Sequence, residues 1–156
     1  MKIVILIPVF NDFKSASKLI EEIDINISEL KVEFSVLVVN DASTEEKILD
    51  TKNLNNIKSL KLINMRNNKG HARCIAAGLK HISENEDFDY VIPMDGDGED
   101  RPEEIRNFLE KIKDNPNQSI VGERVKRSES LIFKICYFFH KIITYTFTGK
   151  FIKFGN

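Results

Sequence analysis

The chain has few of the residues that define several common protein classes. Cysteine occurs only twice in 156 residues, at Cys74 and Cys136, which excludes a disulfide framework, and neither lies in a Cys or His pattern that would bind zinc. The apolar run that begins at Ile3 is interrupted by Asn11 and Asp12, too early for a signal peptide or a membrane span. We therefore expect a protein of the reducing cytosol.

Charge is balanced over the whole chain but unevenly distributed along it. Hydrophobic residues make up 42% and charged residues 30%, as in an ordinary globular domain. Residues 1–123 carry 16 basic and 23 acidic side chains, whereas residues 124–156 carry seven and one, together with six of the eleven phenylalanines. An acidic body is thus followed by a basic, aromatic end, and so small a basic cluster argues against nucleic-acid binding.

Hydrophobic periodicity predicts an α/β fold. Short runs rich in Val and Ile alternate with segments of helical period, which is typical of a parallel sheet covered by helices. The expected strands are residues 3–9, 34–39, 60–65, 90–94 and 119–121, and the expected helices are residues 14–30, 44–54, 71–83 and 102–113. Right-handed crossovers then give an open, Rossmann-like, doubly wound and mostly parallel sheet with helices on both faces.

Polar side chains gather where the strands are expected to end. These ends carry Asn11 and Asp12, Asn40 and Asp41, residues 66–68, and residues 95–100. Any one such loop is explained as a turn or a helix cap. Four together indicate a ligand site, because doubly wound sheets bind ligands beyond the carboxyl ends of their strands.

The segment DGDGED, residues 95–100, is the most informative motif. Its four carboxylates repel one another unless a cation lies among them. Hard oxygen ligands suit Mg²⁺ or Mn²⁺, which bind through one or two carboxylates together with substrate phosphates. The motif therefore predicts a divalent ion that carries a phosphorylated ligand.

The motif has three other interpretations. A calcium-binding EF-hand loop fails at its sixth position, which is Asp100 instead of Gly, and at its twelfth, which is Arg106 instead of Glu. A phosphatase with a nucleophilic Asp would normally carry such a pair after its first strand, and here it follows the fourth. A solvated acidic turn that caps the next helix is the simplest alternative.

A second motif, RNNKGHARCIAAGL at residues 66–79, joins a basic, amide-rich loop to a helix that starts at Gly70. Helix N-termini and basic side chains both suit phosphate, so Arg66, Lys69 and Arg73 are candidates to neutralise a diphosphate. Exposed basic residues are common, which makes this indication weak by itself. His71 is expected to be a loop or cap residue instead of a catalytic base.

The order of these motifs resembles that of a known enzyme family. IPVFND at residues 7–12, VVNDAS at 38–43, the second motif and MDGDGEDRPEEI at 94–105 are similar to the inverting glycosyltransferases of family 2, which have the GT-A fold. The polyprenyl-phosphate branch, with its dolichol-phosphate mannosyltransferase-like enzymes, is the most similar, also through VGERVKR at 121–127. The resemblance implies transfer of a sugar from a UDP- or GDP-linked donor, with Mg²⁺ or Mn²⁺ as cofactor.

The resemblance also implies roles for single residues. The resemblance implies donor contacts at Pro8, Val9, Phe10, Asn11, Asp12, Asp41 and Asp95. The basic loop and helix start named above add Arg66, Lys69 and Gly70 as candidate contacts to the donor phosphates. Asp95, Asp97 and Glu99 match the positions of metal ligands, and Asp97 is expected to be catalytic. Arg124 matches a catalytic arginine on the acceptor side, with Lys126 and Arg127 as helpers. Asn40 and Ala42 depart from the Asp and Gly that the family often shows.

The end of the chain is expected to face the acceptor. The resemblance divides the chain into a nucleotide-sugar-binding core, residues 1–123, and an acceptor-side segment, residues 124–156, that is incomplete at its C-terminus. A polar stripe runs along an expected helix at residues 130–148 and consists of Lys134, Tyr137, Lys141, Thr144 and Thr148. Such a helix either lies on a membrane surface, which would make the protein peripheral at the cytoplasmic face, or packs in the core of a larger domain.

Two questions of function stay open from the sequence. An acceptor polyprenyl phosphate is already anionic and needs no general base, whereas a hydroxyl acceptor would need a carboxylate. A non-catalytic module that binds nucleotide sugars or a partner protein is the main alternative. Nucleotidyl transfer is weaker, because IPVFND lacks the Gly and Arg expected in the first loop of such enzymes.

Overall fold

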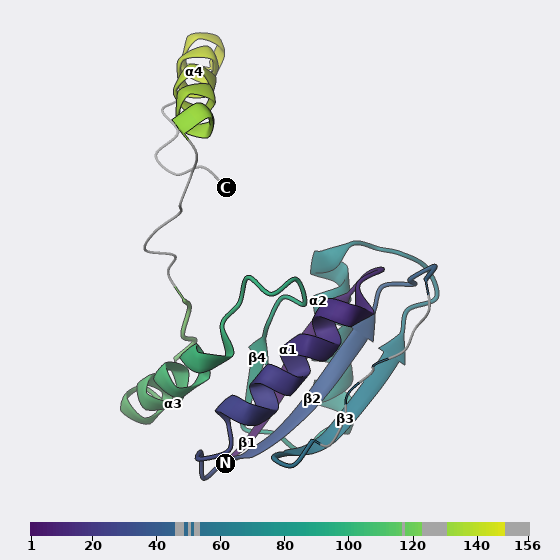
Figure 1. Ribbon diagram of the computed structural model, residues 1–156. Coiled ribbons are helices and arrows are strands. Elements are labelled where there is room, and N and C mark those ends of the chain that lie inside the picture. Colours follow the sequence, from purple (N-terminus) through teal and green to yellow (C-terminus); the bar gives the residue numbers. More distant parts are fainter. Residues whose placement is uncertain (46–48, 50, 52–53, 117, 123–130, 149–156) are drawn as a thin grey trace. The chain divides into compact units, whose positions relative to one another are not determined.

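The computed structural model describes residues 1–45, 49, 51, 54–116, 118–122 and 131–148. The elements in chain order are β1 (Lys2–Val9), α1 (Phe13–Asn26), β2 (Glu33–Asn40), β3 (Ile57–Asn64), α2 (His71–Asn85), β4 (Tyr90–Pro93), the 3-10 helix η1 (Pro102–Glu104), α3 (Ile105–Asp114) and α4 (Leu131–Thr148) (Figure 1). They fall into two compact units, Met1–Ile120 and Val121–Asn156. The first unit holds every described element except α4.

A four-stranded parallel sheet in the order β3-β2-β1-β4 forms the centre of the first unit. β1 pairs with a strand on either side, and its residues from Ile3 to Val9 are buried. A run of apolar residues without alternation is what a strand covered on both faces requires. The strand order reverses between β1 and β4, the place beside which doubly wound sheets bind ligands.

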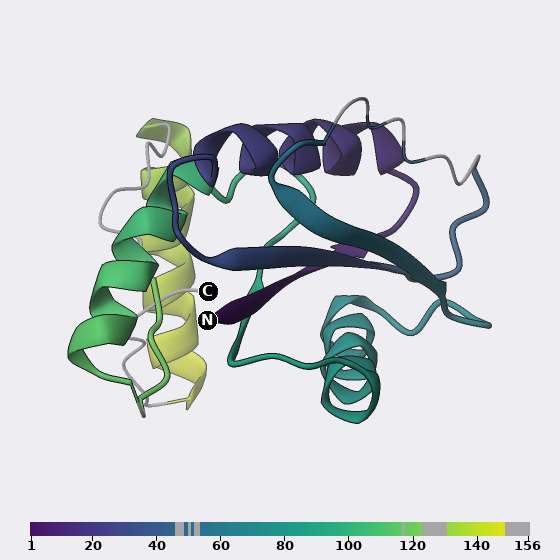
Figure 2. The ribbon, with the colours of Figure 1, turned by 90° about the horizontal axis from the view of Figure 1, so that it is seen from below.

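The helices of the first unit lie on opposite faces of the sheet (Figure 2). α1 and α3 pack on the face that carries Ile3, Ile5 and Ile7, whereas α2 packs on the face that carries Val4 and Leu6. Right-handed crossovers require this arrangement. The connection through α1 leads from β1 to β2, and the connection through α2 leads back across the sheet from β3 to β4, so the two helices must lie on opposite faces. The predicted doubly wound α/β fold is confirmed.

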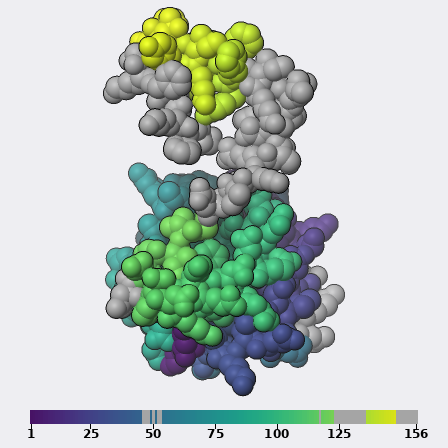
Figure 3. Space-filling view, turned by 90° about the vertical axis from the view of Figure 1, so that its left-hand side faces the viewer, coloured from purple at the N-terminus to yellow at the C-terminus, as the bar shows by residue number. Residues whose placement is uncertain are grey.

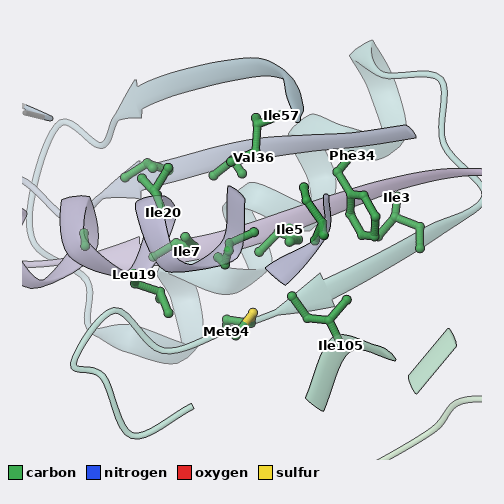
Figure 4. Close-up of a cluster of buried hydrophobic side chains, with 14 of the residues drawn as sticks. Ile3, Ile5, Ile7, Leu19, Ile20, Phe34, Val36, Ile57, Met94 and Ile105 are labelled. Carbon is green, nitrogen blue, oxygen red and sulfur yellow. The ribbon is translucent and has the colours of Figure 1, made fainter. Parts of the chain in front are cut away.

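The larger core fills the space between α1 and the sheet (Figure 4). Leu19, Ile20 and Ile23 recur at helical spacing on α1 and are fully buried, each contributing about 1.5–3 kcal/mol by burial. Ile105 extends this core under α3, and the residues of η1 and α3 cover much of the face seen in Figure 3.

On the opposite face, α2 approaches the sheet closely at Gly78. A Cβ atom at this position would lie 2.9 Å from Val39 Cγ2 and closer still to a methyl group of Leu6. No real Cβ tolerates such contacts, so a larger residue here would push α2 away from the strands whose ends carry the polar loops.

The structure corrects two of the predicted elements. The predicted strand at 119–121 is wrong, since these residues form no strand: a strand needs a neighbour, and in the described part of the chain they pair with none. The predicted helix at 44–54 is also not observed: its described residues are not helical, and residues 46–48, 50, 52 and 53 lie outside the described residues. Leu49 and Leu54 nevertheless pack against the core.

Several predicted boundaries shift by a few residues, and the shifts at the end of α1 and the start of β3 have a structural consequence. α1 ends at Asn26, with Ile27 as its C-cap, instead of continuing to residue 30. β3 begins at Ile57, three residues earlier than predicted, because the backbone that leads into it is bound by a side chain of α1.

That side chain is Asp24, which is buried and only 5% exposed. Its Oδ1 accepts hydrogen bonds of 2.8 Å from the amides of Asn56 and Ile57, and its Oδ2 accepts one of 3.0 Å from the amide of Asn55. Burial raises the pKa of the Asp24 carboxyl, but the hydrogen bonds to its charged form outweigh burial, so the pKa lies below its ordinary value. The carboxylate thus ties α1 to the amino end of β3.

Asp24→Asn should lower the free energy of unfolding by about 1–3 kcal/mol at neutral pH, because the amide nitrogen of Asn would oppose a backbone donor. The pKa of Asp24 is lower in the folded than in the unfolded chain. Its stabilisation is therefore present above the unfolded pKa of about 3.9 and is lost as the pH falls through the folded pKa.

Urea unfolding of both proteins from neutral to acidic pH measures this effect, and the difference between them should shrink on acidification. Glu84→Gln, on the exposed surface of α2, is the control and should change stability by less than about 0.5 kcal/mol. A difference between wild type and Asp24→Asn that does not depend on pH would contradict the assignment.

Candidate functional site

The candidate site lies at the carboxyl edge of the sheet, where all four strands end because they are parallel (Figure 1). Four loops meet this edge: residues 10–12 after β1, 41–45 after β2, 65–70 after β3 and 94–101 after β4. Hydrogen bonds connect the loops after β1, β2, β3 and β4 in that order, one loop to the next.

Asn11 connects the first loop to the second. Its backbone amide donates to Ser43 Oγ over 2.9 Å, and its side-chain Oδ1 accepts from the amide of Thr44 over 2.8 Å. The backbone of Asn11 has a φ of 53°, a left-handed conformation that Asn adopts more readily than most residues. Asn11 was predicted to contact a nucleoside, and the structure places its side chain against the second loop.

Asp41 connects the second loop to the third. Its side chain is only 3% exposed, and its Oδ1 and Oδ2 accept from the backbone amides of Lys69 and Gly70, each over 2.8 Å. Its own amide donates to Val9 O over 2.8 Å. The carboxylate therefore holds the turn into α2 against the ends of β1 and β2.

Cys74 lies on α2 beside this carboxylate. Its thiol is buried and donates to Val39 O over 3.2 Å. Burial, with a further contribution from the negative charge of Asp41, raises the pKa of Cys74 to about 11. The thiol therefore stays protonated and serves as a packing residue with a weak hydrogen bond.

His71 connects the third loop to the fourth. It is the first residue of α2, and its Nε2 lies 2.7 Å from Asp95 Oδ1, with both side chains about half exposed. Within the fourth loop, the amide of Asp95 donates to Asp100 Oδ2 over 2.7 Å, and the amide of Glu99 donates to Asp97 Oδ1 over 2.9 Å. Sequence reasoning treated His71 as a loop or cap residue and missed this contact.

The other residues predicted to contact the donor differ in their exposure to solvent. Pro8 and Val9 are buried within β1, so beyond them the loop exposes Phe10, which is 49% exposed. Asp12 caps α1 by accepting from Ser15 N over 3.1 Å. Arg66, Lys69 and Gly70 are exposed in the third loop, and the predicted acceptor residues Arg124, Lys126 and Arg127 lie outside the described residues.

Gly96 allows the acidic loop to lie directly against β1. A Cβ at this position would be 3.3 Å from Pro8 O and 3.3 Å from Ile7 Cγ2, tighter than side chains normally pack. Gly98 has a φ of 83°, which turns the chain back so that Asp97 and Glu99 are exposed. The structure thus explains both glycines of the motif. Together they allow the loop to present its carboxylates at the end of the central strand.

The carboxylates of this loop are not gathered into a complete metal site. Among the residues described by the structure, no three Asp, Glu, His or Cys side chains come together closely enough to hold a metal ion. Asp95 and Asp97 nevertheless supply exposed, hard oxygen ligands from one loop. This donor set fits Mg²⁺ or Mn²⁺, which keep waters and substrate phosphates as further ligands.

Sequence reasoning placed Asn40 among the polar strand ends and noted it as a departure from the family, but it missed the structural role of this side chain. Asn40 is fully buried; its Nδ2 donates to Asn64 Oδ1 over 2.7 Å, and its Oδ1 accepts from Ser43 N over 2.9 Å. The position of a polar residue directly after a buried apolar strand was the available indication. Asn40 holds the second loop to β3.

Comparison with known sequences gives a family match over nearly the whole chain. The family described as Glycosyl transferase family 2 matches residues 4–154. A dolichol-phosphate mannosyltransferase of Pyrococcus furiosus is 28% identical over 126 residues, which are 81% of this chain and 34% of that protein. An undecaprenyl-phosphate 4-deoxy-4-formamido-L-arabinose transferase of Proteus mirabilis is 26% identical over 135 residues, 85% of this chain and 40% of that protein.

The chain is shorter than the curated relatives that it matches. An uncharacterised protein of Methanocaldococcus jannaschii is 28% identical over 141 residues, which are 89% of this chain and 59% of that protein. The chain therefore spans between about a third and three fifths of the length of these three relatives.

Solved structures share the fold of the chain. TarS of S. aureus, residues 1–349, matches with a TM-score of 0.59 at 22% identity, over 82% of this chain and 39% of that one. The same protein in complex with UDP-GlcNAc matches with a TM-score of 0.58, over 82% of this chain and 38% of that one. This likeness confirms the predicted GT-A fold.

The left-handed backbone of Ala42, with a φ of 56°, generates a stability prediction. A non-glycine residue in this conformation costs roughly 1–2 kcal/mol. Ala42→Gly should therefore raise the free energy of unfolding by about 1 kcal/mol, less the entropy that Gly adds to the unfolded chain. Ala72→Gly, in the first turn of α2, is the matched control and should destabilise; chemical unfolding in which Ala42→Gly also destabilises would refute the prediction.

Proposed function

The chain belongs to glycosyl transferase family 2, and we propose that it transfers a sugar from a nucleoside-diphosphate sugar to a polyprenyl phosphate at a membrane surface. The observation that carries this proposal is the set of four connected loops at the carboxyl edge of the sheet, with basic residues in one loop and acidic residues in another. The donor class is supported by TarS, which binds UDP and UDP-GlcNAc. The acceptor class is supported by relatives named for undecaprenyl phosphate and dolichol phosphate.

The third and fourth loops would bind the donor diphosphate between them. Arg66 and Lys69 are exposed beside the start of α2, where cationic side chains and the positive end of the helix dipole attract phosphate. Asp95 and Asp97 would hold Mg²⁺ or Mn²⁺ together with the donor phosphates, and the side chain of Glu99 would have to move toward them to serve as a third ligand. When bound, this ion would neutralise the charge that develops on the leaving nucleoside diphosphate.

The proposed transfer is a single displacement that inverts the anomeric carbon. An oxygen of the acceptor phosphate forms the new bond to this carbon while the bond to the diphosphate oxygen breaks, and the electron pair leaves with the nucleoside diphosphate. No general base is needed, because the acceptor oxygen is already anionic. Arg124, Lys126 and Arg127 are proposed to hold the acceptor phosphate in line.

We propose that α4 lies on the membrane surface. Exposed apolar side chains lie along it, among them Phe138, Phe139 and Phe147, and Lys141 Nζ lies 4.7 Å from the centroid of the Tyr137 ring. No helix in the described ranges is long and apolar enough to cross a membrane. A helix with basic and apolar residues suits the interface of an anionic bilayer, and the proposed location is the cytoplasmic face.

A nucleotide-sugar-binding module without transferase activity is the second candidate. Binding of a nucleotide sugar needs only the loops at the carboxyl edge of the sheet, whereas transfer also needs groups that hold the acceptor, and those proposed for this role lie outside the described residues. Transfer of a labelled sugar from UDP- or GDP-linked donors to a short polyprenyl phosphate separates the two candidates, because a module that only binds would leave the lipid unlabelled.

Asp97→Asn should weaken binding of the preferred nucleoside diphosphate at least about tenfold in the presence of Mn²⁺, because one anionic metal ligand is lost. Titration calorimetry of the full chain with UDP and with GDP, with and without Mn²⁺, measures this. Asp114→Asn, which removes an exposed carboxylate at the end of α3, is the control and should bind as the wild type does. Absence of metal-dependent binding of either nucleotide by the folded wild type would refute the donor site.

Lys141→Gln should lower partitioning into vesicles of three parts phosphatidylcholine and one part phosphatidylglycerol about fivefold, since a lysine near an anionic surface contributes about 1 kcal/mol. Co-sedimentation of the full chain with these vesicles measures the effect. Vesicles of phosphatidylcholine alone are the control, on which variant and wild type should differ by less than about twofold. Equal partitioning of both proteins into the anionic vesicles would argue for a helix that packs against protein.

A further inference from the structure

We propose that Asp41 is a positioning residue: its buried carboxylate fixes the backbone at the start of α2, and the selectivity for the nucleotide base is set by other groups. The inference rests on the proposed nucleotide site. It replaces the direct contact with the base or the ribose that the family resemblance implies for this residue.

The geometry of the carboxylate carries the proposal. Each of its oxygens accepts one backbone amide over 2.8 Å, from Lys69 and from Gly70, and these two amides follow each other along the chain. Hydrogen bonds to an ionised acceptor are stronger than neutral ones. The residues that donate are themselves exposed, so a loop at the surface is anchored through its backbone to a carboxylate inside.

The anchored turn controls two neighbouring groups. Gly70 is the N-cap of α2 and has a φ of 86°, a conformation that glycine adopts easily. The hydrogen bond from the Gly70 amide to Asp41 therefore helps to set the direction in which α2 begins. His71 follows directly and contacts Asp95 of the acidic loop over 2.7 Å. Lys69 precedes Gly70 and carries one of the two exposed cations of the third loop. Asp41 thus acts on both sides of the proposed diphosphate site without touching the diphosphate.

Asp41 is buried, whereas groups that recognise a nucleobase must be accessible to it. With 3% of its surface exposed and both oxygens bound to backbone amides, Asp41 offers a nucleobase little access. Phe10, on the neighbouring loop after β1, is half exposed. A nucleoside at this edge therefore meets groups such as Phe10 before it meets Asp41.

Asp41→Asn tests the proposal, because Asn keeps the shape but turns an amide group toward one of the two donors. In the absence of nucleotide, hydrogen exchange of the Lys69 or Gly70 amide should become at least about tenfold faster. The affinities for UDP and for GDP should fall by the same factor, to within about twofold, so that their ratio is kept. A direct contact with the base would instead change this ratio.

Asp24→Asn is the matched control, because it alters another buried carboxylate that binds successive backbone amides, at the opposite edge of the sheet. It should leave exchange at Lys69 and Gly70 and both nucleotide affinities within about twofold of the wild type. This separates loss of the anchored turn from general loss of stability.

Two results would overturn the proposal: unchanged exchange at both amides in Asp41→Asn, or a shift of more than about tenfold in the ratio of UDP to GDP affinity. If the variant does not fold, exchange in the wild type decides, since Lys69 and Gly70 must exchange at least about tenfold more slowly than Asn67 and Asn68 after correction for intrinsic rates. If the wild type binds neither nucleotide, the proposed function fails, while exchange still decides whether Asp41 anchors the turn.

Discussion

The site depends on the pairing of β1 with a parallel strand on each side. β1 is buried on both faces, and this burial is what places β2 and β4 beside it with all their carboxyl ends at one edge. Acidic, basic and amide-rich loops that lie up to about 90 positions apart in the sequence thereby become neighbours. The polar edge is therefore a consequence of the apolar centre.

The loops at this edge hold one another in place mainly through side-chain oxygens that accept hydrogen bonds from backbone amides. Asn11 and Asp41 direct their side-chain oxygens at backbone amides of the next loop, and His71 continues the series to the acidic loop. Fixed loops suit catalysis, because groups that are already placed need no reorganisation when charge develops on a leaving group. The exposed carboxylate of Asp97 accepts a hydrogen bond within its own loop, from the amide of Glu99, and remains accessible to a ligand.

The sequence predicted the fold class well because a buried parallel strand is recognisable from an unbroken apolar run. It predicted the polar edge for the same reason, since polar residues follow the runs that form the four strands of the sheet. It could not predict that Asp41 binds the amides of Lys69 and Gly70, because backbone donors have no sequence pattern and their position depends on α2 and β2 together. The wrong strand at 119–121 has a related cause, because pairing depends on a neighbour that local sequence does not reveal.

In the proposed function, a nucleoside diphosphate binds across these four connected loops. Amide chemical-shift changes on titration of the isotopically labelled chain with UDP or GDP and Mg²⁺ test it most directly. We expect the largest changes within residues 9–12, 40–45, 66–71 and 95–100, all at the carboxyl edge of the sheet. Changes centred on the amino edge, around Asp24 and residues 55–57, or no changes with either nucleotide, would contradict it.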